Sequence, residues 1–315
     1  MNLPPVIFIF FNRPEVTRRT FREIRAQRPR RLYLIADGPR ANKPGEDALC
    51  HETRALVESL LDWDCEVTRD YADTNLGCGR RVSSGLTSAF AMLGEAIVLE
   101  DDVLPRPEFF QFCGRLLEQF RHEPRIHAIN GFNPLGRYAP RHGSFTPSVF
   151  NPIWGWASWQ RSWQDYRFKF DAWRDSAVQE RVRKHVSSDL INQYFARSFD
   201  HMLEGNLDTW DFQWTFTMLE RKRVSLVSAV NLIENIGFAS DATHTTHAEP
   251  YFSGLKTHQV VATSRERSID RPDRTHDELY ANVVMSPSSA KIRLIRLVAR
   301  SPLLQRLLVR RRSAT

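Results

Sequence analysis

Several features that identify common classes of protein are missing from this 315-residue sequence. Its four cysteines, Cys50, Cys65, Cys78 and Cys113, form no C-x-x-C pair, so we expect neither a zinc site nor a disulfide-stabilised scaffold. No G-x-G-x-x-G or G-x-x-x-x-G-K-S/T motif occurs. Their absence argues against a dinucleotide-dependent enzyme and against a P-loop enzyme.

Long hydrophobic runs are also missing. The apolar run at residues 6–11 follows no basic segment and is too short for a signal peptide or a membrane span, so we expect a cytoplasmic protein. Lysine and arginine number 44 against 37 aspartates and glutamates, a net charge of +7 that suits a polyanionic neighbour. No zinc-finger or RNP-like pattern is present and the basic residues are spread, so we do not expect nucleic-acid binding.

The first part of the chain alternates short apolar runs with amphipathic segments. Strands are predicted at residues 6–11, 31–36, 65–68, 96–99 and 126–130, and the segments between them place apolar residues at helical spacing. This alternation is typical of an α/β protein with a mostly parallel, Rossmann-like sheet flanked by helices. In such sheets ligands bind beyond the carboxyl ends of the strands.

Three consecutive carboxylates, Glu100, Asp101 and Asp102, follow the predicted strand at 96–99 directly. Such a strand end suits Mg²⁺ or Mn²⁺ bound together with a diphosphate. The alternative is a solvated acidic turn that begins the next helix. Arg13 and Asp37 follow the first two predicted strands, so the same edge of the sheet is expected to carry them.

The second part of the chain changes to aromatic loops and helices. Trp154 and Trp156 belong to a tryptophan-rich segment, part of which we expect in the core and part as a platform for a sugar ring. Residues 175–222 are predicted to be helical. Within them Trp210 precedes Asp211, which is either a dipole partner in the first turn of a helix or a catalytic carboxylate.

The C-terminal part combines a polar loop, a connector and a basic tail. His244 lies in the loop and is either solvated or an additional metal ligand near the acidic site. Residues 251–288 are expected to be a connector. Residues 289–315 are predicted to form a basic amphipathic helix, which suits an anionic membrane surface, with packing against its own domain as the alternative.

Five segments in this order resemble bacterial nucleotide-sugar glycosyltransferases of the GT-A fold, above all the N-acetylglucosaminyltransferase I-like and family 2-like groups. The segments are Phe11-Asn12-Arg13-Pro14, Ala36-Asp37-Gly38, Val98-Leu99-Glu100-Asp101-Asp102, Trp154-Gly155-Trp156 and Trp210-Asp211. The resemblance covers about residues 4–245. It implies a GT-A domain over residues 1–250, with a donor half at about 1–131 and an acceptor half at about 132–250.

The resemblance also implies roles for individual residues. Asp102 would bind Mn²⁺ or Mg²⁺, with His244 as a second ligand, and Asp211 would be the catalytic base. The expected donor-binding residues are Arg13, Asp37, Arg80, Arg81, Glu100 and Asp101. The expected acceptor-binding residues are Trp154, Trp156 and Trp210.

Together these features predict a metal-dependent, inverting glycosyltransferase, either a hexosyl- or an N-acetylhexosaminyltransferase. The expected donor is a nucleotide-diphosphate sugar, a UDP-sugar in particular, and the expected acceptor is a cell-envelope glycan or a lipid-linked sugar. The protein would lie on the inner face of the cytoplasmic membrane. The alternatives are a sugar nucleotidyltransferase, against which the glycine-free segment at residues 11–14 argues, and a non-catalytic module that binds glycans and membranes.

Overall fold

The computed structural model describes residues 3–139, 143–186, 188–205, 207–237, 252, 254–259, 269, 271–285 and 289–305. Strands and helices alternate in the first part of the chain, in the order β1 (Val6–Phe10), α1 (Pro14–Gln27), β2 (Arg31–Ala36), α2 (Glu46–Ser59), β3 (Glu66–Tyr71), α3 (Cys78–Leu93), β4 (Glu95–Glu100), β5 (Val103–Pro105), α4 (Pro107–Gln119) and β6 (Ile126–Asn130). Helices predominate afterwards, in the order β7 (Phe145–Ser148), β8 (Trp156–Trp159), α5 (Gln160–Trp163), the 3₁₀ helix η1 (Asp171–Arg174), α6 (Ser176–Val186), α7 (Asp189–Leu203), α8 (Asp211–Glu220), β9 (Val224–Ser228), β10 (Ile233–Asn235), α9 (Arg274–Met285) and α10 (Ser289–Ala299).

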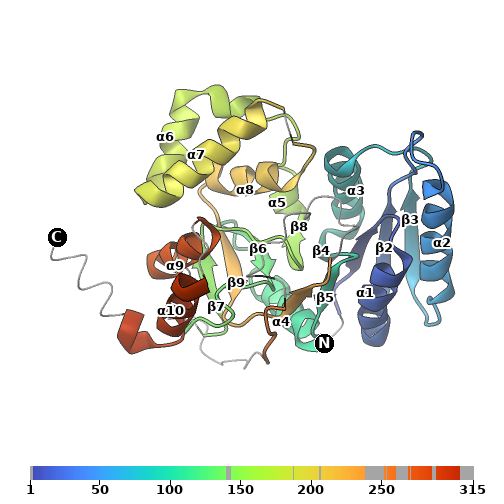
Figure 1. Cartoon of the computed structure of the whole chain (residues 1–315), viewed down its shortest axis with the longest axis horizontal. Helices are drawn as coiled ribbons and strands as arrows, with labels where there is room; N and C mark the ends of the chain where they lie inside the picture. The colour runs from blue at the N-terminus through green and yellow to red at the C-terminus, as the bar shows by residue number, and fades with distance from the viewer. Residues whose placement is uncertain are drawn as a thin grey trace.

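An eight-stranded sheet crosses the molecule in the order β3-β2-β1-β4-β8-β6-β9-β7, and β10 pairs with β5 in a small second sheet (Figure 1). β1 runs parallel to β2 and β4, β2 to β3, and β6 to β9. β8 is antiparallel to both β4 and β6, and β7 is antiparallel to β9. The predicted fold class is confirmed: a mostly parallel, Rossmann-like sheet flanked by helices, the architecture expected of a GT-A fold.

Helices cover both faces of the sheet, which explains why its central strands have continuous apolar sequences. On one face Phe8 and Leu34 pack with apolar residues of α1, α2 and α4. On the other face Ile7 and Ile35 pack with α3, α5 and α8. Because successive strand residues point to opposite faces, single strands supply both cores.

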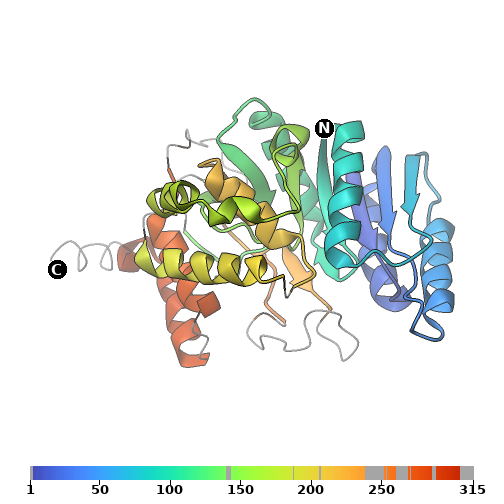
Figure 2. The ribbon, with the colours of Figure 1, turned by 90° about the horizontal axis from the view of Figure 1, so that it is seen from above.

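A third apolar core joins the helices of the second half of the chain. It is formed by α6, α7, α8 and α9, with Phe195 and Phe199 of α7 against Phe216 of α8. Figure 2, seen from above, shows α6, α7 and α8 lying over the part of the sheet that includes β6 and β9. The helical region expected in the second half of the chain is therefore present.

The described tail packs against the domain with one of its faces. Ile292, Ile295 and Ala299 of α10 are buried with residues of α9 and the loop at Leu135 and Tyr138. Within the segment at 251–288 that was expected to be a connector, residues 274–285 form α9, and its residues Leu279 and Val283 are buried in the same core. The sequence did not predict this helix, because the segment is polar and contains Pro272. None of the helices in the described part of the chain is both long and apolar enough to cross a membrane.

Candidate active site at the acidic edge of the sheet

The predicted strand-end residues come together at the carboxyl ends of β1 and β4. Because these strands are neighbours, Arg13, just after β1, reaches the residues that follow β4. Its guanidinium forms an ion pair with Asp101 and lies 3.0 Å from Oδ2 of Asp102. The Thr20 hydroxyl donates to the backbone carbonyl of Asp101 over 2.7 Å. We call Arg13, Glu100, Asp101 and Asp102 the acidic edge.

The small sheet closes one side of the acidic edge. The backbone N–H of Ile236, just after β10, donates to the carbonyl of Asp102 over 2.8 Å. A β-carbon added to Gly237 would lie 2.2 Å from Oδ2 of Asp102. Only glycine therefore leaves the Asp102 carboxylate in its place, a role that the sequence alone did not indicate.

Asp37 lies at the end of β2 and anchors the loop that precedes α3. Its carboxylate accepts hydrogen bonds from the N–H groups of Gly38 (2.8 Å) and Leu76 (2.9 Å) and from the Asn75 amide (2.9 Å). Burial raises the pKa of Asp37, while these N–H donors oppose the rise. The loop approaches so closely that a β-carbon on Gly38 would meet the backbone of Thr74 at 2.5 Å.

The two arginines predicted to contact the donor differ in burial. Arg80 is exposed, with its guanidinium 5.6 Å from the centre of the Phe168 ring. Arg81 is buried, lies 2.7 Å from Asp70 Oδ1, and donates to the Ala36 carbonyl over 3.2 Å. Its guanidinium thus ties α3 to the ends of β2 and β3, and donor binding by Arg81 stays a prediction.

Asp211 reaches the same region from a distant part of the chain. It is the first residue of α8, and the Thr209 hydroxyl donates to its carboxylate. Burial raises the pKa of Glu100 to about 8, and neighbouring carboxylates, Asp211 among them, add to the rise. Burial also raises the pKa of the Cys78 thiol, and Glu100 and Asp211 contribute there too. Cys78, at the start of α3, is thus influenced by both Glu100 and Asp211.

Asp208 holds α8 and α3 together. Asp208 lies three residues before the start of α8 at Asp211, and its carboxylate accepts the N–H of Gly79 over 2.9 Å. Gly79 lies in the first turn of α3, where N–H groups lack helical partners and favour a negative charge. This contact spans 129 residues and brings the start of α8 to the edge of the sheet.

A cleft of about 260 Å³ opens beside Asp211. Its described lining is mostly aromatic and apolar, with Asp211, Asn151 and Thr215 as its polar side chains. Trp154 lines it, with its ring 4.5 Å from the Phe132 ring, and Tyr194 and Tyr280 line it as well. We call this space the aromatic cleft.

The three tryptophans predicted to bind an acceptor do not share one environment. Trp154 is partly exposed in the aromatic cleft, as expected of a platform. Trp156 and Trp210 are 1% and 2% exposed, and their stacked rings lie 5.8 Å apart. They form the aromatic cluster with Trp163 and Trp214. Neither ring has a face open to a sugar in this structure, so acceptor binding by Trp156 and Trp210 stays an untested prediction.

Asp102 is the described residue that best fits a divalent cation. Arg13 pairs with both Asp101 and Asp102, but the side chain of Asp102 is 17% exposed and that of Asp101 only 6%. The described residues contain no group of three His, Cys, Asp or Glu side chains placed to hold a metal, and His244 lies outside them. Magnesium and manganese often bind to one or two carboxylates together with substrate phosphates, so this donor set suits an ion that arrives with its ligand.

Some residues of the site carried no signal in the sequence. Tyr194 and Phe195 lie in the region predicted only to be helical, and Phe252 and Tyr280 lie in the segment predicted as a connector, yet all four line the aromatic cleft. In each case the missing information was which distant elements pack together.

The fold and the site define a Rossmann-like α/β protein in which a carboxylate-rich strand end adjoins an aromatic cleft. No family model and no curated protein matches the chain. Among solved structures it is similar to S. aureus TarS 1–349, with a TM-score of 0.43 and 9% identity over 73% of this chain and 59% of that one. It is also similar to HddC from Yersinia pseudotuberculosis, with a TM-score of 0.33 and 9% identity over 53% of this chain and 82% of that one. At these values the chain is assigned to no family, and membership of the N-acetylglucosaminyltransferase I-like group is not shown.

Proposed function

We propose that this protein is a metal-dependent, inverting glycosyltransferase that uses a nucleotide-diphosphate sugar, a UDP-sugar in particular. The observation that carries the proposal is the juxtaposition of Asp211 with the acidic edge. Asp211 is close enough to raise the pKa of Glu100, and it also lines the aromatic cleft. One carboxylate thus faces both a charged region suited to a donor and an apolar space suited to an acceptor.

The acidic edge supports the donor side of this proposal. Arg13 offers a guanidinium suited to the diphosphate, and Asp102 would hold the metal ion. A bound magnesium or manganese ion would supply positive charge to the departing diphosphate. Asp37 would recognise the uracil, and Glu100 and Asp101 would approach the ribose and the donor sugar. His244 as a second metal ligand and Arg80 as a further donor contact remain part of the proposal.

The aromatic cleft supports the acceptor side. Sugar rings present apolar C–H faces that pack on aromatic rings, and Trp154 offers a partly exposed ring there. Ligand pockets typically measure about 300–1,000 Å³, so a cleft of about 260 Å³ suits one sugar unit rather than a long polymer. We propose that the acceptor hydroxyl is held here, next to Asp211.

The reaction then needs one proton transfer and one displacement. Asp211 accepts the proton of the acceptor hydroxyl, and that oxygen bonds to the anomeric carbon of the donor sugar. The bond from this carbon to the diphosphate breaks, and the nucleoside diphosphate leaves with the electron pair. Arg13 stabilises the charge that builds on the leaving group. Since attack and departure occur on opposite faces of the sugar, the anomeric configuration inverts.

The acceptor class and the cellular position are proposals as well. On α10, Leu294 and Leu297 are 63% and 58% exposed beside Arg293. Exposed leucines flanked by basic residues suit the surface of an anionic membrane. We propose a glycan or lipid-linked acceptor of the cell envelope, reached from the inner face of the cytoplasmic membrane.

The direct test compares Asp211→Asn with Asp208→Asn. The chain is incubated with Mn²⁺, a panel of sugar nucleotides and an extract of cell-envelope acceptors, and nucleoside diphosphate release is measured. We expect Asp211→Asn to lower turnover by about 10²- to 10⁴-fold, the contribution of a general base, with donor binding retained. Asp208→Asn is the matched control, because an asparagine oxygen can still accept the Gly79 N–H.

Three results would contradict the proposal. Equal turnover in wild type and Asp211→Asn would remove Asp211 as the base. Release of pyrophosphate instead of nucleoside diphosphate would identify a nucleotidyltransferase. No turnover with any donor would leave a binding module as the remaining interpretation.

A further inference from the structure

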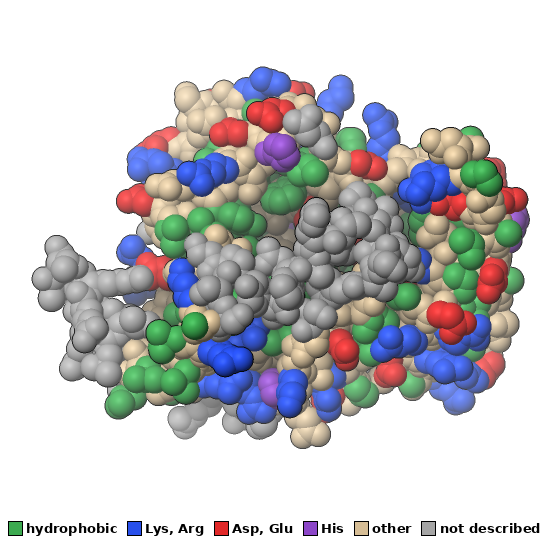
Figure 3. All heavy atoms as spheres, in the orientation of Figure 1, with side chains coloured by type: hydrophobic (Ala, Val, Ile, Leu, Met, Phe, Trp, Pro, Cys, Tyr) green, Lys and Arg blue, Asp and Glu red, His purple; other side chains and the backbone are tan. Residues whose placement is uncertain are grey.

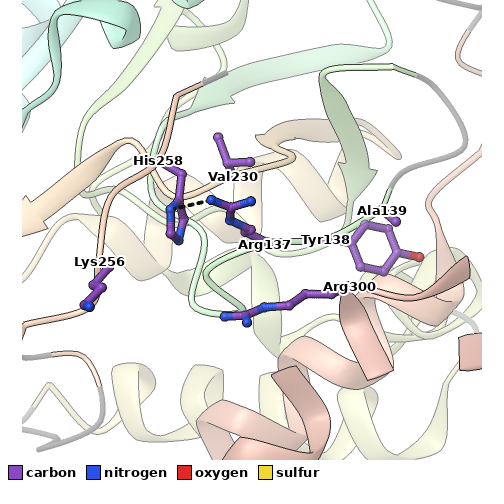
Figure 4. Close-up of a pocket in the computed structure, with 7 residues that line it drawn as sticks. All are labelled: Arg137, Tyr138, Ala139, Val230, Lys256, His258 and Arg300. Atoms are coloured by element: carbon purple, nitrogen blue, oxygen red, sulfur yellow. Dashed lines mark hydrogen bonds between the residues drawn. The ribbon is translucent and has the colours of Figure 1, made fainter. Parts of the chain in front are cut away.

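A second pocket, of about 620 Å³, is lined by cationic side chains, and it shares none of its described lining residues with the aromatic cleft. We call it the basic pocket and define it by Arg137, Lys256, His258 and Arg300 (Figure 4). Arg137 belongs to the loop after β6, Lys256 and His258 to the segment at 254–259, and Arg300 follows α10. Three separate parts of the chain therefore bring these side chains together.

The hydrogen bond between Arg137 and His258 determines which nitrogen of the imidazole carries the proton. Nη2 of Arg137 lies 2.9 Å from Nδ1 of His258. A guanidinium can only donate, so Nδ1 is the acceptor and the hydrogen of the neutral ring is on Nε2. Burial and the neighbouring cations, Arg137 first among them, lower the pKa of His258 and favour this neutral form. The ring therefore keeps one N–H donor for a ligand.

The positive charge of the basic pocket is not balanced within the described part of the chain. No carboxylate lines the pocket there, and Arg137, Lys256 and Arg300 form no ion pair with a described residue. Arg106, beside Thr257, differs, since it pairs with Glu108. Figure 4 shows Arg300 extending beneath Arg137 and His258 toward the same space. Cations that converge without a described carboxylate beside them are suited to an anionic ligand.

We propose that the basic pocket binds a phosphate group. Its oxygens can accept from the guanidinium groups of Arg137 and Arg300 and from Nε2–H of His258, and Lys256 adds a fourth donor. A phosphate brings more charge and more acceptor oxygens than a carboxylate, which matches donors that arrive from three directions. The pocket is much larger than one phosphate, so the group would belong to a larger molecule. The site is independent of the proposed transferase reaction.

Two sources offer this chemistry, a soluble phosphorylated molecule and the headgroup of an anionic phospholipid. The helix that precedes Arg300 also exposes Leu294 and Leu297, which would be next to lipid chains if the headgroup is the source. The two arms of the experiment use inorganic pyrophosphate and vesicles of phosphatidylglycerol, with phosphatidylcholine vesicles for comparison. Binding in either arm that depends on the pocket supports the site and identifies its source.

In the first arm the full chain is titrated with pyrophosphate by calorimetry, in buffer with a chelator so that metal-dependent donor binding does not contribute. The second arm measures co-sedimentation with the vesicles. The Arg137→Gln/Arg300→Gln double variant should weaken binding by about tenfold or more in at least one arm. The charge-matched control is Arg22→Gln/Arg30→Gln, two exposed arginines outside the pocket and outside α10, which should bind nearly as wild type does.

The outcomes distinguish specific binding in the basic pocket from nonspecific electrostatic attraction to the net positive charge. Equal weakening in both double variants would overturn the proposal in favour of net charge, and absence of binding by wild type in both arms would overturn it outright. Pyrophosphate binding that is lost in Arg13→Gln but kept in Arg137→Gln/Arg300→Gln would assign the anion to the acidic edge instead. If the double variant does not fold, Lys256→Gln tests the same pocket at an exposed side chain and should weaken binding severalfold.

Discussion

Two regions of the molecule position their side chains by different means. One is the acidic edge, and the other is the aromatic cluster together with the aromatic cleft, which we call the aromatic half. At the acidic edge each group lies at or just after the end of a strand. These groups are held by ion pairs and by hydroxyl and N–H donors from neighbouring elements. In the aromatic half the position of a ring depends on helices from distant parts of the chain. Trp154 and Trp156, two residues apart, consequently lie in a cleft and in a core.

The position of a polar residue at a strand end can therefore be deduced from the strand itself. The position of an aromatic ring depends on which distant elements pack around it. Figure 3 shows charged side chains of both signs interspersed with hydrophobic ones over the described part of the face seen in Figure 1. If side chains are positioned in these two ways, substitutions of neighbouring residues of the same type should change stability or binding by different amounts, according to the environment of each side chain.

The largest effect is expected from the tryptophan pair. Trp156→Ala should lower the free energy of unfolding by about 3–5 kcal/mol, because it opens a cavity among Trp163, Trp210 and Trp214. Trp154→Ala should cost about 1 kcal/mol, since its ring is partly exposed. Urea unfolding of both variants measures the difference. Similar losses would mean that the distinction between cluster and cleft does not hold.

The sequence predicted the fold and the acidic edge well for a physical reason. Parallel strands that are buried on both faces have continuous apolar sequences, and their ends lie at one edge of the sheet, so the ends of β1, β2 and β4 could be located without the structure. Arg13 and Asp101 were placed together on this basis alone, and the structure pairs them.

Other positions could not be predicted, because they depend on contacts between distant segments. Arg80 and Arg81 are adjacent in the sequence, and only the approach of α3 to Asp70 makes one of them structural. Phe252 and Tyr280 line the aromatic cleft although the sequence around them is polar. His244 stays a prediction, since it lies outside the described residues.

The arginine pair provides the next test. Arg81→Gln should lower the free energy of unfolding by about 2–3 kcal/mol, less than for a fully buried ion pair because Asp70 is partly exposed. Arg80→Gln should change it by about 0.5 kcal/mol or less, because this side chain is at the surface. Chemical denaturation again decides. A larger loss for Arg80→Gln would reverse the assignment of the two residues.

Gly237→Ala should have a smaller effect on stability, but it should directly change the position of a carboxylate of the acidic edge. The added methyl group must displace the Asp102 carboxylate, at a cost of about 1–2 kcal/mol. Calorimetry should show that Mn²⁺-dependent binding of UDP weakens by about tenfold, if Asp102 holds the metal. Gly114→Ala in α4 is the control, because alanine favours the helix and meets only the Pro4 ring. Unchanged binding in Gly237→Ala would place the metal elsewhere.

The smallest effect on stability is expected at Asp37. Substitution there can separate two roles of this residue, anchoring the loop before α3 and recognising uracil. Asp37→Asn keeps an oxygen that accepts from Gly38 and Leu76, but its amide nitrogen faces the Asn75 amide and cannot accept from it. We therefore expect a loss of about 1 kcal/mol in the free energy of unfolding, the net value of one hydrogen bond. If Asp37 also recognises uracil, the affinity for UDP should fall by more than the affinity for pyrophosphate, which has no base. Equal losses for both ligands would leave Asp37 as an anchor of the loop before α3 and remove it from donor recognition.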